Sequence, residues 1–126
     1  MTAPLHLLYV DDDPDIRTIV QLALGLDPAI RLSLAGSGVE ALALLGEGLR
    51  PDAVLLDVMM PGPDGPALFD TLRRGAGWDE MPVLFVTARG RRRDIEALEQ
   101  QGARGVILKP FDPVGLAAEI RALLSA

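Results

Sequence analysis

The stretch LHLLYVDDDPDIR (residues 5–17) joins an apolar run to three adjacent aspartates and then to the start of an amphipathic segment. Its first six residues are apolar apart from His6, which is typical of a strand buried on both faces of a sheet. Asp13 and Pro14 are the residues expected at the N-cap and first turn of a helix. The stretch therefore predicts a strand that passes directly into a helix, with a cluster of carboxylates at the junction.

The same order of strand and helix recurs along the chain. Apolar runs predict further strands at residues 30–35, 53–57, 83–87 and 105–109. Apolar residues at helical spacing, with proline near the start or glycine near the end, predict helices at residues 15–26, 39–48, 66–77, 91–102 and 113–124. Alternating strands and helices indicate βαβ units with right-handed crossovers, and hence a parallel sheet between two layers of helices. We expect an α/β fold, a three-layer (βα)5 domain.

Length and composition limit the classes of function. The 126 residues suit one domain, so we expect residues 1–126 to form a single unit. A net charge of −6 argues against binding of nucleic acid or of an anionic membrane surface by the domain as a whole. The absence of cysteine excludes disulfides and thiolate metal sites. No apolar run approaches the roughly 18 to 20 residues that span a bilayer, and the N-terminus does not resemble a signal peptide, so we expect a cytoplasmic location.

Polar residues stand where the predicted strands end. In open parallel sheets, sites form outside the C-terminal ends of the strands, where Asp11, Asp12, Asp57, Thr87 and Lys109 would meet. Clustered carboxylates repel one another unless a proton is taken up, a cation binds, or the side chains point apart. Hard oxygen ligands without histidine or cysteine favour Mg²⁺ or Ca²⁺, and Mg²⁺ suits so few ligands because it keeps several waters and pairs with phosphate.

Phosphate chemistry would use the remaining residues of this edge. Asp57 stands at a strand end before a loop rich in proline and glycine, residues 61–65, which would expose it as a nucleophile towards phosphorus. Lys109 would neutralise one phosphoryl oxygen, the Thr87 hydroxyl or a backbone amide would bind another, and the acidic pair at residues 11 and 12 would bind the metal.

Four motifs, VDDDP (10–14), LLDVMMPGPDG (55–65), VTA (86–88) and LKPF (108–111), closely resemble the receiver domain of bacterial two-component response regulators. The resemblance extends over essentially the whole chain. It implies a CheY-like, flavodoxin-like sheet in the strand order 2-1-3-4-5. It also implies a cytoplasmic signalling switch rather than an enzyme, with magnesium-dependent transfer of a phosphoryl group from the phosphohistidine of a sensor histidine kinase or a phosphotransfer protein.

The resemblance assigns a role to each residue that matches a motif of the family. Asp57 is the phosphoacceptor, Thr87 the switch hydroxyl, and Lys109 the residue that neutralises phosphate. The implied magnesium ligands are Asp11, Asp12, Asp57 and the backbone carbonyl of Met59. The partner of the phosphorylated state, a downstream protein or an output domain, would bind the face formed by the fourth helix, the fifth strand and the fifth helix. No direct binding of nucleic acid by this domain is expected.

Two departures from the family pattern concern the output. Val106 occupies the position of an aromatic side chain that normally follows the switch hydroxyl, so the usual coupling between the two is in doubt. Arg104 and Gly105 also replace the acidic pair found in winged-helix DNA-binding regulators, which leaves the corresponding dimer salt bridges unsupported.

Two alternative functions remain open from the sequence. A receiver-fold binding module could signal through constitutive contacts without phosphate, a reading favoured by Val106 alone. A magnesium-dependent phosphatase could use Asp57 as its nucleophile. Such enzymes usually place a second acid two residues later, where this chain has Met59, and this favours the switch.

Several other residues have structural or undecided readings. Asp15 favours the dipole of the first helix, and His6 is expected to pack in its strand rather than to act as a ligand. The basic cluster at residues 91–93 is our hypothesis for a contact with an acidic partner. The sequence does not decide whether Trp78 is exposed or packed, or whether the Lys109–Pro110 bond is cis.

Overall fold

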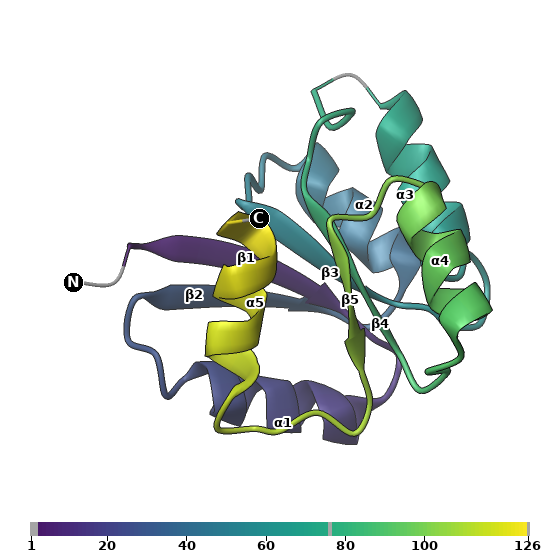
Figure 1. Cartoon of the computed structure of the whole chain (residues 1–126). Helices are drawn as coiled ribbons and strands as arrows, with labels where there is room; N and C mark the ends of the chain where they lie inside the picture. Colours follow the sequence, from purple (N-terminus) through teal and green to yellow (C-terminus); the bar gives the residue numbers. More distant parts are fainter. Residues whose placement is uncertain (1–2, 76, 126) are drawn as a thin grey trace.

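The computed structural model describes residues 3–75 and 77–125, and within them a single five-stranded sheet forms the centre of the molecule (Figure 1). All neighbouring strands are parallel, in the order β2-β1-β3-β4-β5. The predicted fold class and strand order are confirmed. The strands are β1 (Leu5–Val10), β2 (Ile30–Ala35), β3 (Ala53–Asp57), β4 (Val83–Thr87) and β5 (Gly105–Leu108).

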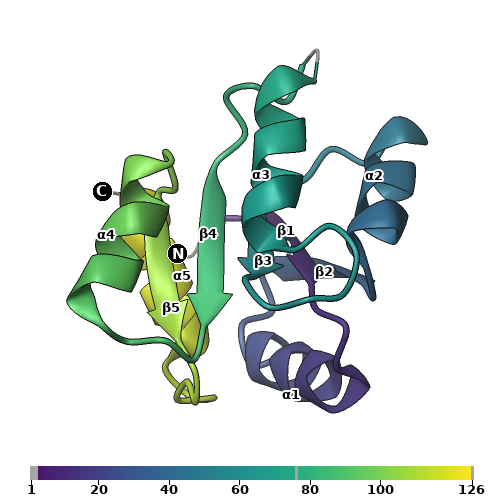
Figure 2. The same ribbon diagram turned by 90° about the vertical axis from the view of Figure 1, so that its right-hand side faces the viewer.

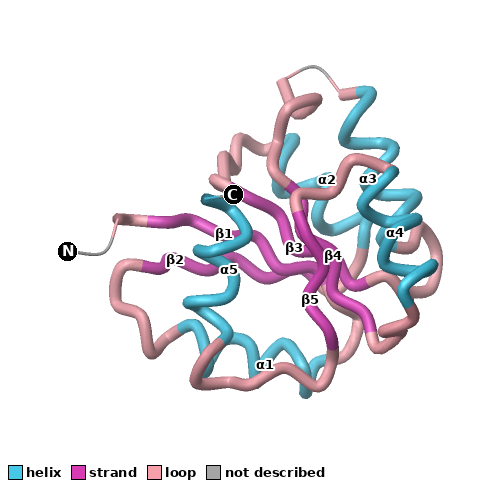
Figure 3. Tube along the Cα trace, in the orientation of Figure 1, coloured by secondary structure: helices cyan, strands magenta, loops and turns pink. Residues whose placement is uncertain are grey.

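One helix follows each strand, and the helices cover both faces of the sheet (Figures 1 and 2). α1 and α5 lie on one face, and α2, α3 and α4 lie on the other, which gives the three layers (Figure 3). No helix in the described part of the chain is both long and apolar enough to cross a membrane. The helices are α1 (Pro14–Leu24), α2 (Gly38–Gly46), α3 (Gly65–Arg74), α4 (Arg92–Gln100) and α5 (Leu116–Ser125).

Two apolar cores, one on each face of the sheet, hold the layers together. Every residue of β3 and β4 is buried, which accounts for strand sequences that are apolar without alternation. In the core under α2, α3 and α4, the rings of Phe69 and Phe85 pack 5.6 Å apart. The core under α1 and α5 contains Tyr9, Leu55 and Ile120. Trp78, undecided from the sequence, is partly buried against the first of these cores.

The helix starts mostly match the capping signals in the sequence. The side chain of Asp13 accepts hydrogen bonds from the backbone N–H groups of Asp15 and Ile16, which confirms it as the N-cap of α1. Ser37 and Asp64 cap α2 and α3 in the same way. At α4 the N-cap is Arg91, and no side-chain hydrogen bond caps that helix.

The element bounds differ from the prediction chiefly at the end of α3, which is Arg74 rather than residue 77, and at the start of α5. α5 was expected from Pro113, but residues 113–115 form a turn, in which the Gly115 N–H donates to the Asp112 carbonyl and the helix begins at Leu116. β5 ends at Leu108, one residue before Lys109, and the Lys109–Pro110 peptide bond is cis. Residues 1, 2, 76 and 126, which the predictions for the domain and the third helix included, lie outside the described part of the chain.

Candidate functional site

The register of the parallel strands brings the acidic residues together. Val10 of β1 pairs with Leu56 of β3, so Asp11 and Asp57 continue these strands side by side. One carboxylate oxygen from each of Asp11, Asp12 and Asp57 lies within 4.8 Å of the others. Asp11 and Asp57 are buried, whereas Asp12 is exposed. The cluster expected from the strand ends is present and opens to solvent on one side.

Lys109 reaches this cluster from the end of β5. Its ammonium nitrogen Nζ lies 3.1 Å from Asp11 Oδ2 and 3.1 Å from Asp57 Oδ1. Burial alone would lower the pKa of Lys109, but hydrogen bonds and attraction to Asp57 and Asp11 outweigh it and raise the pKa. Lys109 is therefore a cation held between two carboxylates, and it offsets only one of the three acidic charges.

The surroundings of Asp57 perturb the ionisation of its carboxyl group. Burial, followed by repulsion from Asp11, raises its pKa to about 6, although Lys109 acts in the opposite direction. The carboxyl group thus takes up a proton at a higher pH than an exposed aspartate does, chiefly because it is buried and next because it faces Asp11. A further cation at this position would favour the carboxylate form.

Asp11 is held by contacts that the sequence analysis missed. The Tyr9 hydroxyl donates to Asp11 Oδ2 at 2.6 Å, and the Asp13 N–H donates to Asp11 Oδ1 at 3.0 Å. Burial, and then the hydrogen bond to Asp11, raise the pKa of Tyr9, so its hydroxyl remains a donor. The signal was available in the sequence, since residues two apart in a strand point to the same side. Arg17 also donates to the Asp11 carbonyl at 2.7 Å.

Thr87 ends β4 beside Asp57 and is buried. Asp57 pairs with Val86 in the ladder, which places Thr87 one residue beyond it. The Thr87 carbonyl accepts a hydrogen bond from the Lys109 N–H at 2.8 Å, so the last two strands stay in register up to the site. Its hydroxyl oxygen accepts the backbone N–H of Arg89 at 3.0 Å. The hydroxyl is thereby connected to the loop between β4 and α4.

The loop after Asp57 returns to the end of β3. At Gly65, the first residue of α3, an added Cβ would lie 2.6 Å from the Asp57 carbonyl oxygen, closer than real contacts allow. Gly62 has φ +73°, a left-handed conformation that favours glycine. Met59 stands in this loop with a side chain that is 60% exposed. The glycines thus allow a short connection back to the end of β3, but the loop does not expose Asp57 as expected from the sequence, since Asp57 is only 5% exposed.

The donor set fits a hard divalent cation. The three acidic side chains supply only oxygen atoms, and the carboxylates carry more negative charge than Lys109 balances. Oxygen ligands in small number, next to solvent that can supply waters, suit Mg²⁺. Asp11, Asp12 and Asp57 are the residues that could hold it, and Met59 is close enough in sequence to add a backbone carbonyl.

Comparison with known proteins identifies the family. The family model described as the response regulator receiver domain matches residues 7–121. The chain belongs to the response regulator receiver domain family. The receiver domain resemblance seen in the four strand-end motifs is confirmed, and the relatives are regulators rather than classical enzymes.

Relatives in sequence and structure agree with this assignment. The receiver is 39% identical over 125 residues to the response regulator Rre1 of Synechocystis sp., covering 99% of this chain and 54% of the relative. It is 37% identical over 122 residues to the DNA-binding response regulator MtrA of Mycolicibacterium smegmatis, covering 94% and 50%. The chain thus spans about half the length of these curated relatives. The structure of the chemotaxis response regulator CheY4 of Vibrio cholerae superposes with a TM-score of 0.84 at 29% identity, covering 97% of this chain and 99% of that one.

Within this receiver fold, Val106 occupies a distinctive place on β5. It pairs with Phe85 in the ladder and is partly buried against the core that lies under α2, α3 and α4. A valine at this position has no ring that could alternate between buried and exposed positions. The replacement of the family's aromatic residue by Val106 therefore lies on β5, which pairs with β4, the strand that ends at Thr87.

Proposed function

We propose that this receiver domain is a phosphorylation-dependent switch in which Asp57 accepts a phosphoryl group from the phosphohistidine of a sensor histidine kinase or of a phosphotransfer protein. One observation carries the proposal: Asp57 stands at a strand end beside a second carboxylate, and Lys109 Nζ lies 3.1 Å from both. We extend the proposal to residues 1–126 as one receiver domain acting in the cytoplasm, where such a phosphodonor is made.

The proposed transfer requires Asp57 to act as a carboxylate nucleophile. A carboxylate oxygen forms the new bond to phosphorus, the bond from phosphorus to the histidine nitrogen breaks, and the released imidazole takes up a proton. Lys109, already beside Asp57, would neutralise one phosphoryl oxygen, and the Thr87 hydroxyl would donate to another. Attack by water on the aspartyl-phosphate would later release inorganic phosphate and restore Asp57.

Magnesium is the cofactor that this site would use. Asp11, Asp12, Asp57 and the Met59 carbonyl would hold it, and the close packing of the three carboxylates supports that assignment. When bound, Mg²⁺ would supply positive charge to the phosphoryl oxygens in transfer and in hydrolysis. It would also favour the ionised form of Asp57, whose pKa is raised to about 6 without it.

The output would pass from Thr87 to the α4-β5-α5 face. If the Thr87 hydroxyl moves towards the phosphoryl group, the oxygen that accepts the Arg89 N–H moves with it, and we infer that the start of the loop before α4 shifts as well. A downstream protein or an output domain would bind the altered face. With Val106 on β5, we assign the coupling to this loop rather than to a moving ring.

Two other functions fit the site less well. A binding module independent of phosphate would not need Lys109 between two buried carboxylates, since that arrangement costs desolvation. A phosphatase would need a general acid near Asp57, and Met59 cannot serve as one. The arrangement of charges favours the switch over both.

Backbone NMR spectra would test the switch directly. Spectra are recorded with Mg²⁺ before and after addition of a small acyl-phosphate donor, on the wild type and on Asp57→Asn. We expect new signals for Thr87, Arg89 and the first turn of α4 in the wild type only. Wild-type spectra that remain unchanged, or that change as much in Asp57→Asn, would contradict the proposal.

A further inference from the structure

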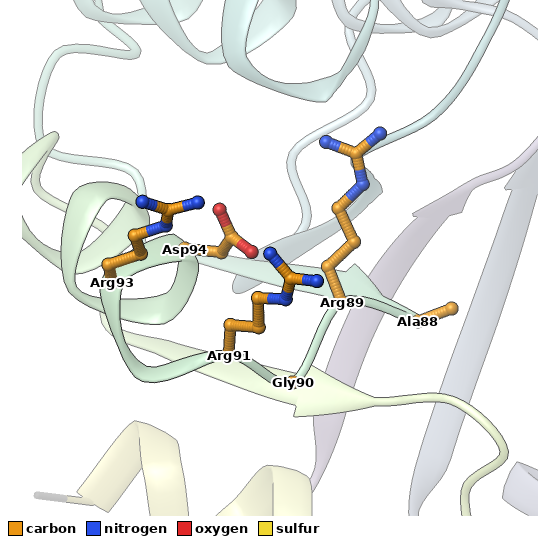
Figure 4. Close-up of a pocket in the computed structure, with 6 residues that line it drawn as sticks. All are labelled: Ala88, Arg89, Gly90, Arg91, Arg93 and Asp94. Atoms are coloured by element: carbon orange, nitrogen blue, oxygen red, sulfur yellow. The ribbon is translucent and has the colours of Figure 1, made fainter.

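The loop between β4 and α4 carries an arginine pocket outside the acidic site. A cavity of about 480 Å³ is lined by Arg89, Arg91 and Arg93, together with Ala88, Gly90 and Asp94. Figure 4 shows the three arginine side chains extending from the loop and the start of α4 towards the same side, with Asp94 between Arg91 and Arg93. All three arginines are exposed. We call this surface the arginine pocket.

The arginines of this pocket bind no partner in the part of the chain that the structure describes. Within residues 3–75 and 77–125, the side chains of Arg89, Arg91 and Arg93 make neither a salt bridge nor a hydrogen bond. By contrast, arginines in other parts of the fold donate to specific oxygens. Arg17 donates to the carbonyl of Asp11 and Arg73 to the carbonyl of Met81. Arg121 donates to the carboxylate of Asp27. The positive charges at the pocket therefore do not serve to hold the fold together.

Their placement is unfavourable for the isolated domain. Cations at the N-terminus of a helix oppose the helix dipole, and α4 begins with Arg91 as an N-cap that makes no side-chain hydrogen bond. The first turn of α4 contains one acidic residue, Asp94, whose carboxylate lines the pocket and leaves an excess of two positive charges there. A group of unpaired cations at this position, in a chain with net charge −6, indicates a surface made for an external anion.

We propose that the arginine pocket binds an acidic peptide segment of the protein that reads the output of the switch. The planar guanidinium group binds carboxylates in a bidentate manner, and three such groups around one cavity match several acidic side chains of an extended segment. The overall acidity of the domain and the carboxylate of Asp94 disfavour the long anionic backbone of a nucleic acid. This inference rests on the proposed function, because only a switch would have an output partner that carries the acidic segment.

Binding of a model acidic peptide tests the pocket. The probe is a fluorescently labelled peptide in which glutamate alternates with glycine, titrated with the protein and followed by fluorescence anisotropy at low and at high salt. We expect Arg91→Glu/Arg93→Glu to weaken binding by about tenfold or more, because both contacts become repulsive. Arg31→Glu is the control: it reverses the charge of one exposed arginine of β2, outside the pocket, and should leave the affinity within about twofold of the wild type.

The outcomes separate the pocket from the switch. The proposal would be overturned if Arg31→Glu weakened peptide binding as much as Arg91→Glu/Arg93→Glu does, or if the double substitution did not weaken it. The proposal would also be overturned if a labelled DNA duplex bound more tightly than the peptide and if Arg91→Glu/Arg93→Glu abolished that DNA binding. Asp57→Asn is titrated in parallel, because retained peptide binding in that variant supports the pocket even if Asp57 accepts no phosphoryl group.

Discussion

Asp57 and Asp11 share one corner of the sheet, and their proximity makes the metal-free domain sensitive to pH. In the native state, burial and repulsion from Asp11 raise the pKa of Asp57 from 3.8 to about 6. Between these two values the folded chain retains a proton that the unfolded chain has lost. The contribution of this retained proton to the free energy of unfolding is therefore complete below about pH 4 and is lost as the pH rises through about 6.

Asp57→Asn should remove this dependence. In a chelating buffer we expect the free energy of unfolding of the wild type to fall, relative to that of the variant, by about 1–2 kcal/mol between pH 4 and pH 7, allowing for solvent screening. Urea denaturation at the two pH values measures the difference. Parallel pH profiles for the two proteins would show that Asp57 is not perturbed in this way.

Tyr9 makes a second prediction at the residue scale. Tyr9→Phe keeps the ring in its core but removes the donor that lies 2.6 Å from Asp11 Oδ2. Since Asp11 is fully buried, we expect the free energy of unfolding at pH 7 to fall by about 1.5–3 kcal/mol, the range for a hydrogen bond to a charged group. An unfolding midpoint in urea equal to that of the wild type would mean that Lys109 and the Asp13 N–H satisfy Asp11 by themselves.

At the scale of elements, the strands and most helix starts could be predicted because local chemistry determines them. Continuous apolar runs gave all the strands within a residue of their bounds, and Asp13 predicted the start of α1. The start of α5 could not be predicted from Pro113, because proline suits both a helix and the turn that Asp112 supports. The packing of Trp78 and the cis form of Lys109–Pro110 depend on distant parts of the chain, which the sequence pattern does not report.

The connection from β3 to α3 gives a prediction at this scale. Gly65→Ala would force the new Cβ against the Asp57 carbonyl oxygen, so α3 or the loop must move, at a cost of about 1–3 kcal/mol. Gly46→Ala is the matched control, since a Cβ there meets nothing within 4 Å and should leave stability equal or slightly higher. Thermal unfolding of both variants checks the difference, and equal effects would contradict the close approach.

At the scale of the whole molecule, the candidate site was predictable because parallel strands place their C-terminal ends at one edge. Asp57 is 46 residues and Lys109 is 98 residues from Asp11 along the chain. The register of β1, β3, β4 and β5 nevertheless brings the three together at this edge. The sequence could not predict that Lys109 contacts both carboxylates, because these contacts depend on how the lysine side chain extends. The contact of Tyr9 with Asp11 was missed, although their spacing of two residues along one strand indicates side chains on the same side. Nor did it predict the cavity between the arginines that precede and begin α4.

The central claim is that this edge of the sheet makes Asp57 a phosphoacceptor. Intact-mass measurement after incubation with a small acyl-phosphate donor, with Mg²⁺ or with a chelator, tests it most directly, with Asp57→Asn as the control. The account predicts one added phosphoryl group on the wild type with Mg²⁺, far less with the chelator, and none on the variant. An unmodified wild type in the presence of Mg²⁺, or equal modification of Asp57→Asn, would contradict it.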